Sequence, residues 1–297
     1  MKIGIDIGGS HVAIGVVNRS GKILKQIEKD YTEDEKKSGR LIEIAENFIV
    51  QSIDEVKKKY KVESIGIAIP GTIADGILLK SVNLGIENYD LKDSLQSKLG
   101  VKVNVRNDAK CAALAESKYG KNSDKKNILF LSLGTGIGGA YIYEGILLTG
   151  SILDGFEFGH TILRPGGIKC NCGKFGCFEK YGSILAFKRR CIERLNLSYD
   201  ISGPDLRNAI SENMNNVKDI IDDYIADLAL GVSNFINIFE PDVTIIGGGF
   251  ARYDYLLLDL LKEKIIKDRL LFNLRDSVNI DVATLGNDAG IIGATLC

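Results

Sequence analysis

The chain has 297 residues, of which 45% are hydrophobic, and it carries a formal net charge of −1 with a sequence pI of about 6.2. A near-neutral chain lacks the summed positive field that attracts nucleic acid or an anionic membrane surface, so neither is expected as a partner. The sequence opens without a leader pattern and has no apolar run near the roughly 20 residues of a membrane span, which predicts a cytoplasmic protein. Its length is enough for two domains.

The first thirty residues form a predicted strand meander. Apolar residues recur in the segments 3–7, 12–18 and 22–28, and glycine-containing turns separate these segments. This pattern predicts three antiparallel strands. The charged run at 30–37 that follows is predicted to be a solvated loop.

Helices and strands alternate through the rest of the first half. Apolar residues at helical spacing predict a helix over 38–60, and a short apolar run predicts a buried strand over 64–69. A loop that contains Asn83 leads to a predicted helix at 91–99 and a strand at 101–105. Asn107 and Asp108 then begin a helix that runs to about residue 119, and either of them is a candidate N-cap.

The strand pattern of the first thirty residues recurs in the second half, where strands at 127–133 and 138–143 flank a glycine turn. The other predicted elements of this half are helices at 183–195, 204–212 and 215–239, a strand at 242–246, and a last helix from 287. We therefore predict a smaller lobe of residues 1–118, onto which the helix at 287–297 packs back, and a larger lobe of residues 119–286.

A glycine-rich turn follows the first strand of each of the two meanders. The residues are Gly8, Gly9 and Ser10 in the first turn and Gly134, Thr135 and Gly136 in the second. Glycines leave backbone N–H groups open to the close approach of an anion, so both turns suit a triphosphate. Each turn alone is more simply a tight hairpin turn, and their duplication is what favours nucleotide binding.

The second turn also matches the dinucleotide pattern G-x-G-x-x-G through Gly134, Gly136 and Gly139. That pattern requires a helix after the glycines, because the helix N-terminus takes the pyrophosphate. Residues 140–143 instead alternate and are rich in strand formers. The sequence therefore predicts a hairpin here and not a dinucleotide site.

Two further positions suit a nucleotide and its metal. Asp6 ends the first strand beside a glycine turn, where it is a candidate Mg²⁺ ligand or else a turn-forming aspartate. Gly248 and Gly249 end a later strand, and bare backbone there would let a base or ribose lie close.

One histidine and three cysteines gather in the loop 160–179. They are His160, Cys170, Cys172 and Cys177. Three thiolates and one imidazole make the closed four-ligand shell of a structural Zn²⁺ site, and Gly173 and Gly176 let this short loop turn tightly. The alternative is a redox-active or disulfide-bonded loop.

The other three cysteines, Cys111, Cys191 and Cys297, lie on apolar, helix-like segments. A free cysteine in such a segment usually acts as a small hydrophobe, so these three are given no functional role. A chain of this length without an export signal is expected to keep its thiols reduced.

Six motifs occur together in a fixed order along the chain. They are Asp6-Ile-Gly-Gly-Ser10, Ile69-Pro-Gly71, Asn107-Asp108 with Ala113-Leu-Ala-Glu116, Leu133-Gly-Thr-Gly-Ile-Gly-Gly139, Glu157-Phe-Gly-His160 and Cys170-x-Cys-Gly-x-x-Gly-Cys-x-Glu179. This combination resembles the ROK family of bacterial sugar kinases and repressors over essentially the whole chain. The resemblance implies the α/β fold of the actin-like ATPase (ribonuclease H-like) superfamily, with two lobes and a cleft between them.

The resemblance also implies roles for individual residues. Asp108 would be the general base that accepts the proton of the attacking hydroxyl. The implied sugar contacts are Gly71, Asn83, Asn107, Asp108, Glu157, His160 and Glu179. The implied nucleotide contacts are Asp6, Gly8, Gly9, Ser10, His11, Gly134, Thr135, Gly136, Gly248 and Gly249. The chain departs from the family at Ser10 and His11, where threonine and lysine are usual.

The implied activity is transfer of the γ-phosphate of ATP to the 6-hydroxyl of a hexose, with Mg²⁺ and a structural Zn²⁺, in a homodimer or homotetramer. Glucose is the expected sugar, and N-acetylmannosamine, allose, fructose and N-acetylglucosamine are the alternatives. Repressors of this family carry a DNA-binding segment before the first phosphate motif. Five residues precede Asp6, so a sugar-sensing regulator is not expected.

Overall fold

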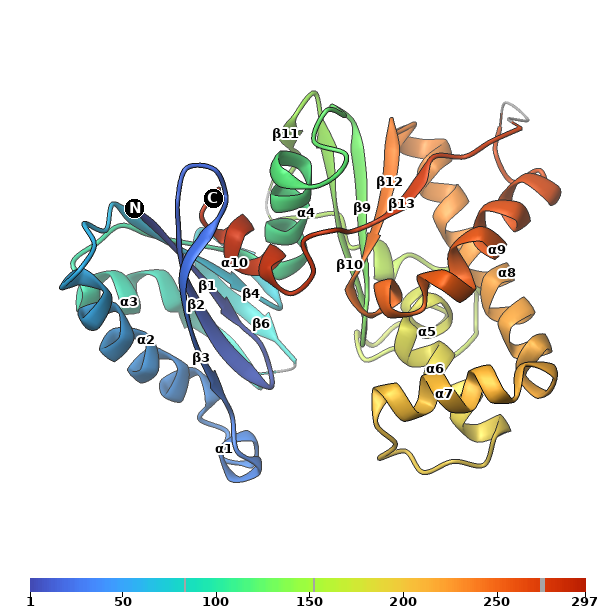
Figure 1. Ribbon diagram of the computed structural model, residues 1–297, viewed down its shortest axis with the longest axis horizontal. Helices are drawn as coiled ribbons and strands as arrows, with labels where there is room; N and C mark the ends of the chain where they lie inside the picture. Colours follow the sequence, from blue (N-terminus) through green and yellow to red (C-terminus); the bar gives the residue numbers. More distant parts are fainter. Residues whose placement is uncertain (83, 152, 273–275) are drawn as a thin grey trace. The chain divides into compact units, whose positions relative to one another are not determined.

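The computed structural model describes residues 1–82, 84–151, 153–272 and 276–297 (Figure 1). Two compact units make up the chain. The first holds Met1–Asp124, Leu147–Phe156 and Thr284–Cys297, and the second holds Lys125–Ile146 and Glu157–Ala283. The segment Leu147–Phe156, which lies in the larger lobe of the sequence-based division, thus groups with the first unit.

A five-stranded mixed sheet forms the centre of the first unit. Its strands are β1 (Lys2–Ile7), β2 (His11–Val17), β3 (Ile23–Asp30), β4 (Ser64–Ile69) and β8 (Val103–Asn107), in the order β3-β2-β1-β4-β8. The first three strands are antiparallel neighbours, and β1, β4 and β8 run parallel. The predicted meander is therefore confirmed, and the three parallel strands end at one edge of the sheet.

Helices cover both faces of this sheet (Figure 1). The helices α2 (Leu41–Lys57) and α3 (Leu91–Leu99) bury apolar side chains in one core with β1 and its neighbours. The opposite face of β1 and β4 meets α10 (Asp288–Ala294), which also packs on α4 (Asp108–Tyr119). Cβ atoms added at Gly4 and Gly66 would lie 1.8 and 1.7 Å from carbonyl oxygens of α10. Glycine at these positions is what lets the helix lie directly on the sheet.

Two segments predicted as loops are structured. Residues Glu33–Lys37 form a short helix, α1, because Thr32 and Glu35 make a reciprocal capping box at its start. Between β4 and α3 lies a three-stranded antiparallel sheet of β5 (Thr72–Ala74), β6 (Ile77–Ser81) and β7 (Ile86–Asp90). The turn between β5 and β6 is Asp75-Gly76 with positive φ at both residues, an ordinary hairpin turn that the loop prediction missed.

The second unit repeats the sheet pattern of the first. Its sheet contains β9 (Ile128–Leu133), β10 (Ile137–Tyr143), β11 (Ile146–Leu147), β12 (Val243–Gly247) and β13 (Ile280–Val282), in the order β11-β10-β9-β12-β13. The division between the two units falls within β11. Strands β9 and β10 are antiparallel, whereas β9, β12 and β13 run parallel. The duplication predicted from the sequence is thus present in the sheet topology.

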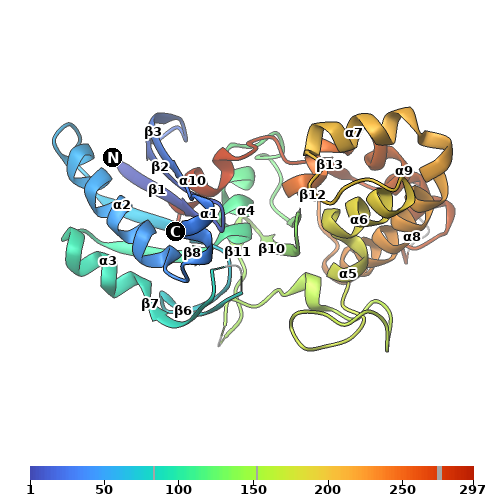
Figure 2. The same ribbon diagram turned by 90° about the horizontal axis from the view of Figure 1, so that it is seen from below.

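The helical elements of the second unit gather beside its sheet (Figure 2). They are η1 (Phe158–His160), α5 (Glu179–Gly182), α6 (Ile184–Arg194), α7 (Gly203–Glu212), α8 (Met214–Phe239), η2 (Gly248–Arg252) and α9 (Asp254–Lys267). The long helix α8 is central, since its Phe235 packs edge-on against Phe158 and its Tyr224 hydroxyl donates to the Gly182 carbonyl. Among the described residues, no helix has both the length and the apolar run that a membrane crossing requires.

Candidate functional site

The candidate residues of the first unit lie where its parallel strands end. Asp6 pairs with Ala68 in register, and Asn107 pairs with Ile69, so the ends of β1, β4 and β8 are neighbours. The Asn107 amide Nδ2 donates to the Gly71 carbonyl at 3.1 Å. Gly71 has φ +136°, and a Cβ there would lie 2.4 Å from the Lys80 carbonyl oxygen. Glycine is therefore required at this turn.

The start of α4 fixes the orientation of Asp108. Asn107 is the N-cap, because its Oδ1 accepts hydrogen bonds from the backbone N–H groups of Ala109 and Lys110 at 3.0 and 3.3 Å. Asp108 is the first helical residue, and its own Oδ1 accepts from the Ala109 N–H at 2.8 Å. Asn107 and not Asp108 therefore caps the helix. The Asp108 side chain is only partly buried.

The carboxyl group of Asp108 influences that of Asp6. Burial, and to a smaller extent the charge of Asp108, raise the pKa of Asp6 to about 7. Burial also raises the pKa of Asp108, whereas the Ala109 N–H hydrogen bond and the charge of Lys110 lower it. A bound cation would relieve this repulsion, which suits the expected Mg²⁺ ligand role of Asp6.

The first glycine turn closes the hairpin between β1 and β2. The Gly8 N–H donates to the His11 carbonyl at 2.9 Å, while Gly9 and Ser10 are exposed at its tip. The Ser10 hydroxyl lies 3.1 Å from His11 Nδ1. The His11 imidazole thus has the neighbouring hydroxyl as a partner. Asn83 lies outside the described residues.

The four predicted zinc ligands come together in the second unit. The ligand atoms of His160, Cys170, Cys172 and Cys177 all lie within 4.8 Å of one another. His160 Nδ1 faces Cys170 Sγ at 3.7 Å, and the Sγ atoms of Cys172 and Cys177 are 3.6 Å apart. A tetrahedral zinc with Zn–S bonds of about 2.3 Å has ligand–ligand separations of about 3.8 Å. The donor set and its spacing therefore fit Zn²⁺.

Short-range backbone contacts shape the loop that carries these ligands. Isolated bridges join Ile162 to Cys177 and Lys169 to Phe175. Gly176 has φ +77°, and a Cβ there would lie 1.7 Å from the Arg164 carbonyl oxygen. The loop thus folds back on itself with a backbone approach that only glycine permits.

Glu179 connects the cysteine–histidine cluster to the second glycine turn. It begins α5, and its Oε2 accepts from the Ile137 N–H at 3.0 Å. Its Oε1 lies 3.8 Å from Cys170 Sγ, and a Cβ at Gly136 would lie 2.4 Å from Oε2. The sequence pattern assigned Glu179 only a sugar contact, and this linking position was missed.

Glu157 and His160 lie on one turn of chain. The turn is η1, and the His160 N–H donates to the Glu157 carbonyl at 3.0 Å. The Glu157 side chain is exposed, whereas His160 is partly buried beside the cysteines. This turn therefore connects one predicted sugar contact to the cysteine–histidine cluster through three residues of backbone.

The remaining nucleotide candidates lie where β9 and β12 end. The turn 134–136 joins β9 to β10 as a hairpin, and the Leu185 N–H of α6 donates to the Gly134 carbonyl at 3.1 Å. Gly248 has φ +71°, and a Cβ there would lie 2.9 Å from the Leu133 carbonyl oxygen. The turns after these two adjacent strands thus share one edge of the sheet, and the rejection of a dinucleotide crossover is confirmed.

Two buried acids were not found by sequence reasoning. Asp227 of α8 is 4% exposed and accepts from Arg164 Nε at 3.0 Å and from Arg190 Nη2 at 3.2 Å. It therefore ties the loop that carries the three cysteines, and α6, to α8. Glu116 is 1% exposed and accepts from the N–H groups of Thr284 and Leu285, both at 2.6 Å. An acid on the apolar face of a predicted helix was the available signal in both cases.

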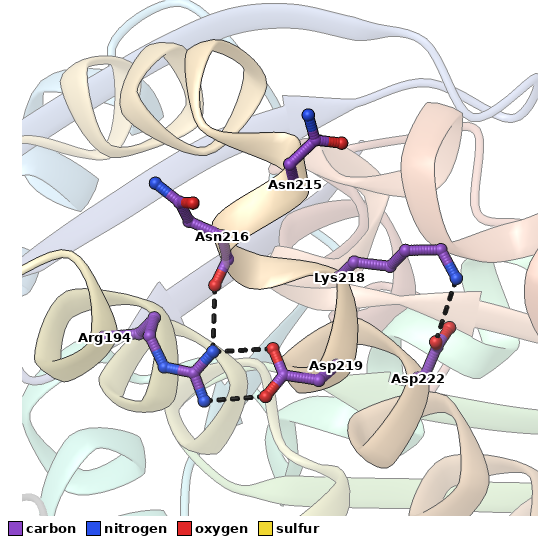
Figure 3. Close-up of a pocket in the computed structure, with 6 residues that line it drawn as sticks. All are labelled: Arg194, Asn215, Asn216, Lys218, Asp219 and Asp222. Carbon is purple, nitrogen blue, oxygen red and sulfur yellow. Dashed lines mark hydrogen bonds and ion pairs between the residues drawn. The ribbon is translucent and has the colours of Figure 1, made fainter.

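A surface pocket between the end of α6 and the start of α8 contains none of the predicted site residues (Figure 3). Its lining residues are Arg194, Asn215, Asn216, Lys218, Asp219 and Asp222. Arg194 donates to both carboxylate oxygens of Asp219 at 2.6 and 2.7 Å, and Lys218 pairs with Asp222 at 3.4 Å. Because its charges already pair with each other, the pocket is not the candidate site.

Comparisons with known proteins agree with this arrangement. The glucokinase of Thermotoga maritima is 34% identical, with 98% of this chain and 95% of that protein covered. The glucokinase of Halalkalibacterium halodurans is 31% identical, with 98% and 92% covered. The crystal structure of a ROK family glucokinase from Streptomyces griseus in complex with glucose and AMPPNP matches with a TM-score of 0.82, at 27% identity and with 99% and 97% covered.

These matches confirm the actin-like α/β fold that the sequence predicted. The model of the ROK family matches residues 2–297, which is nearly the whole chain. The protein therefore belongs to the ROK family.

Proposed function

We propose that this protein is an ATP-dependent hexose kinase that transfers the γ-phosphate of ATP to the 6-hydroxyl of glucose. The observation that carries the proposal is the placement of Asp108 at the first residue of α4, with Asn107 capping the helix and Asp6 near by. The similarity to two glucokinases over more than nine-tenths of their length supports glucose as the sugar.

Asp108 is the general base of the proposed reaction. It accepts the proton of the 6-hydroxyl as that oxygen attacks the γ-phosphorus, while the bond from the γ-phosphorus to the β-phosphate oxygen breaks and ADP leaves. A sugar hydroxyl has a pKa far above 7, so its proton must leave as the new bond forms. Partial burial raises the pKa of Asp108 and makes it a stronger acceptor, whereas the Ala109 N–H and Lys110 favour its ionised form.

Sugar recognition is assigned to His160, Glu157 and Glu179. His160 turns Nδ1 toward Cys170 Sγ, which leaves Nε2 to donate to a sugar oxygen. The two carboxylates accept hydrogen bonds from sugar hydroxyls. A compound without these hydroxyls would leave charged groups unpaired, and so it would be rejected.

Two metal ions complete the proposal. His160, Cys170, Cys172 and Cys177 would hold Zn²⁺, whose effect when bound is to fix the loop that positions His160 and Glu179. Asp6 would hold Mg²⁺, directly or through water, and the bound ion would neutralise phosphate charge. The turns at 8–10 and 134–136, in which Gly9, Ser10 and Thr135 are exposed, would supply backbone N–H groups for the phosphates.

A substrate panel tests the proposal. The zinc-loaded protein is assayed by coupled ADP release at fixed Mg·ATP with glucose, N-acetylmannosamine, allose, fructose and N-acetylglucosamine. Glucose should have the highest kcat/KM, and 6-deoxyglucose should inhibit without being phosphorylated, because it lacks the accepting hydroxyl. Highest activity on an N-acetylated sugar would overturn the substrate assignment. Sugar binding without turnover of any sugar would instead indicate a sugar-sensing regulator.

We also propose that the protein is a cytoplasmic homodimer or homotetramer, as family resemblance suggests. Light scattering on the eluting peak of a size-exclusion column measures the mass directly. A mass of one 32.4 kDa chain at micromolar concentration would contradict the proposed assembly.

A further inference from the structure

Two cysteines without a predicted role lie side by side in the first unit. Cys111 is on the first turns of α4, and Cys297 follows the end of α10 by three residues. They are 186 positions apart in the sequence, yet their Sγ atoms are 3.7 Å apart. Two sulfur atoms at this distance are in van der Waals contact.

Backbone packing brings the two cysteines together. Cys111 is 0% exposed, and a Cβ at Gly293 would lie 1.7 Å from its carbonyl oxygen, so α10 lies directly on α4 here. On the other side, the Asn104 amide donates to the Cys297 carbonyl at 3.2 Å, and the Cys297 N–H donates to the Ala294 carbonyl at 3.3 Å. The two thiols are therefore already in contact in the folded protein.

We propose that Cys111 and Cys297 form an intramolecular disulfide bond when the protein meets a small organic disulfide such as oxidised glutathione. A disulfide bond is about 2.05 Å long, so the sulfur atoms must approach by less than about 2 Å. The partly exposed Cys297 can supply this movement, because it lies beyond the last turn of α10. The proposal does not depend on the kinase activity.

The two thiols have different parts in this reaction. A hydrogen bond from Cys111 lowers the pKa of Cys297, and the charge of Arg106 lowers it further, against the effect of burial. Burial raises the pKa of Cys111. The partly exposed Cys297 is therefore the thiolate that reacts first, and the buried Cys111 is the resolving thiol.

The exchange is balanced in atoms and electrons. The Cys297 thiolate attacks one sulfur of oxidised glutathione, the glutathione S–S bond breaks, and one glutathione thiolate leaves. Cys111 then loses its proton, attacks the Cys297 sulfur and displaces the second glutathione. The two cysteine thiols are oxidised to one disulfide, and one glutathione disulfide is reduced to two thiols.

The bond would join two parts of the chain close to the proposed base. Cys111 lies three residues after Asp108 on α4, while Cys297 follows the helix that packs on β1 and β4. The other four cysteines of the sequence, Cys170, Cys172, Cys177 and Cys191, belong to the second unit. Within the first unit, each of these two cysteines thus has the other as its available partner for a disulfide bond.

Peptide mapping of the full zinc-loaded chain tests the proposal. The protein is incubated with oxidised glutathione, its free thiols are alkylated, and it is digested with trypsin without reduction. Cleavage after Lys110, Lys118 and Arg275 releases the peptides 111–118 and 276–297. We expect a linked species two hydrogens lighter than the sum of these peptides, with loss of their alkylated forms. Dithiothreitol should restore both.

Three variants distinguish the bond from other thiol chemistry. Cys111→Ala suits a site that packs against Ala68 and Ala294, and it should leave Cys297 as a mixed disulfide with glutathione. Cys297→Ser, at a partly exposed position, should abolish the linked species even if the first variant folds poorly. Cys191→Ser should not change it. Separate alkylated peptides from the oxidised wild type, or a link from either cysteine to the second unit, would overturn the proposal.

Discussion

Asp6 lies near the end of β1 and Asp108 begins α4 directly after β8, and the charge of Asp108 disfavours ionisation of Asp6. Two causes together raise the pKa of Asp6 to about 7. Burial is the larger cause, and the charge of Asp108 is the smaller one. Asp6 therefore keeps a proton in the folded protein at pH values where the unfolded chain, with a pKa of about 3.9, has lost it.

This difference makes stability depend on pH. Between about pH 4 and pH 7 the folded state binds more protons at Asp6 than the unfolded state, so the free energy of unfolding falls as the pH rises. In Asp6→Asn the side chain at position 6 does not titrate, so the free energy of unfolding should fall by about 2 kcal/mol less between pH 4 and pH 8 than in the wild type. This figure is half of what the full pKa shift would give, because Asp6 is partly exposed and solvent screens its charge. Urea unfolding of both proteins in EDTA measures this difference. Equal declines in the two proteins would show that Asp6 ionises normally.

Asp108→Asn should remove turnover but keep sugar binding. Loss of a general base lowers kcat by about 10²- to 10⁴-fold, while the asparagine can still accept the Ala109 N–H hydrogen bond. Coupled ADP release measures kcat, and calorimetry measures glucose affinity.

Asp254→Asn is a matched control for this variant. Asp254 is also the first residue of its helix, and its Oδ1 accepts the Tyr255 N–H at 2.9 Å, much as Asp108 accepts the Ala109 N–H. The control should keep full activity. Near-normal kcat in Asp108→Asn would refute the base assignment.

Removal of one proposed zinc ligand should loosen the loop 160–179. The wild type should contain about one zinc per chain, and Cys172→Ser should lower zinc affinity at least about tenfold, because three donors remain. Metal analysis after dialysis against a chelator gives the zinc content, and limited proteolysis reports the loop.

Cys191→Ser is the control for that experiment, since Cys191 is buried on α6 away from the cluster. It should retain its zinc. A metal-free wild type that resists proteolysis and phosphorylates glucose normally would rule out a structural zinc.

Asp227→Asn should destabilise the second unit by about 1–2 kcal/mol. Asp227 is buried between two arginines, but Arg164 is 59% exposed and can recover hydration when its partner is neutralised, so the loss is below the roughly 3–5 kcal/mol of a fully buried pair. Chemical denaturation measures the change.

The exposed pair of Arg194 and Asp219 gives the comparison for Asp227→Asn (Figure 3). Asp219→Asn also breaks a carboxylate–arginine contact, yet it should change stability by less than about 1 kcal/mol, because both side chains are solvated. Equal effects of the two substitutions would mean that burial of Asp227 contributes nothing.

The sequence alone was sufficient for features set by neighbours along the chain. The spacing of Cys170, Cys172 and Cys177 with His160 indicated a four-ligand cluster, because the ligands share one short loop. Strand-forming residues 140–143 showed that a hairpin follows the turn 134–136. Local signals were also present where the prediction was wrong, in the capping box at Thr32 and the Asp75-Gly76 turn.

Only the tertiary structure decided the contacts between distant segments. Nothing in sequence spacing relates Cys111 to Cys297 or Glu116 to Thr284, since each contact depends on how α10 returns to α4 and the sheet. The effect of Asp108 on Asp6 likewise depends on the order of the parallel strands. Residue types and local spacing specify which groups are available for chemistry, whereas burial and through-space distance set their pKa values and partners, and these arise only when the chain packs.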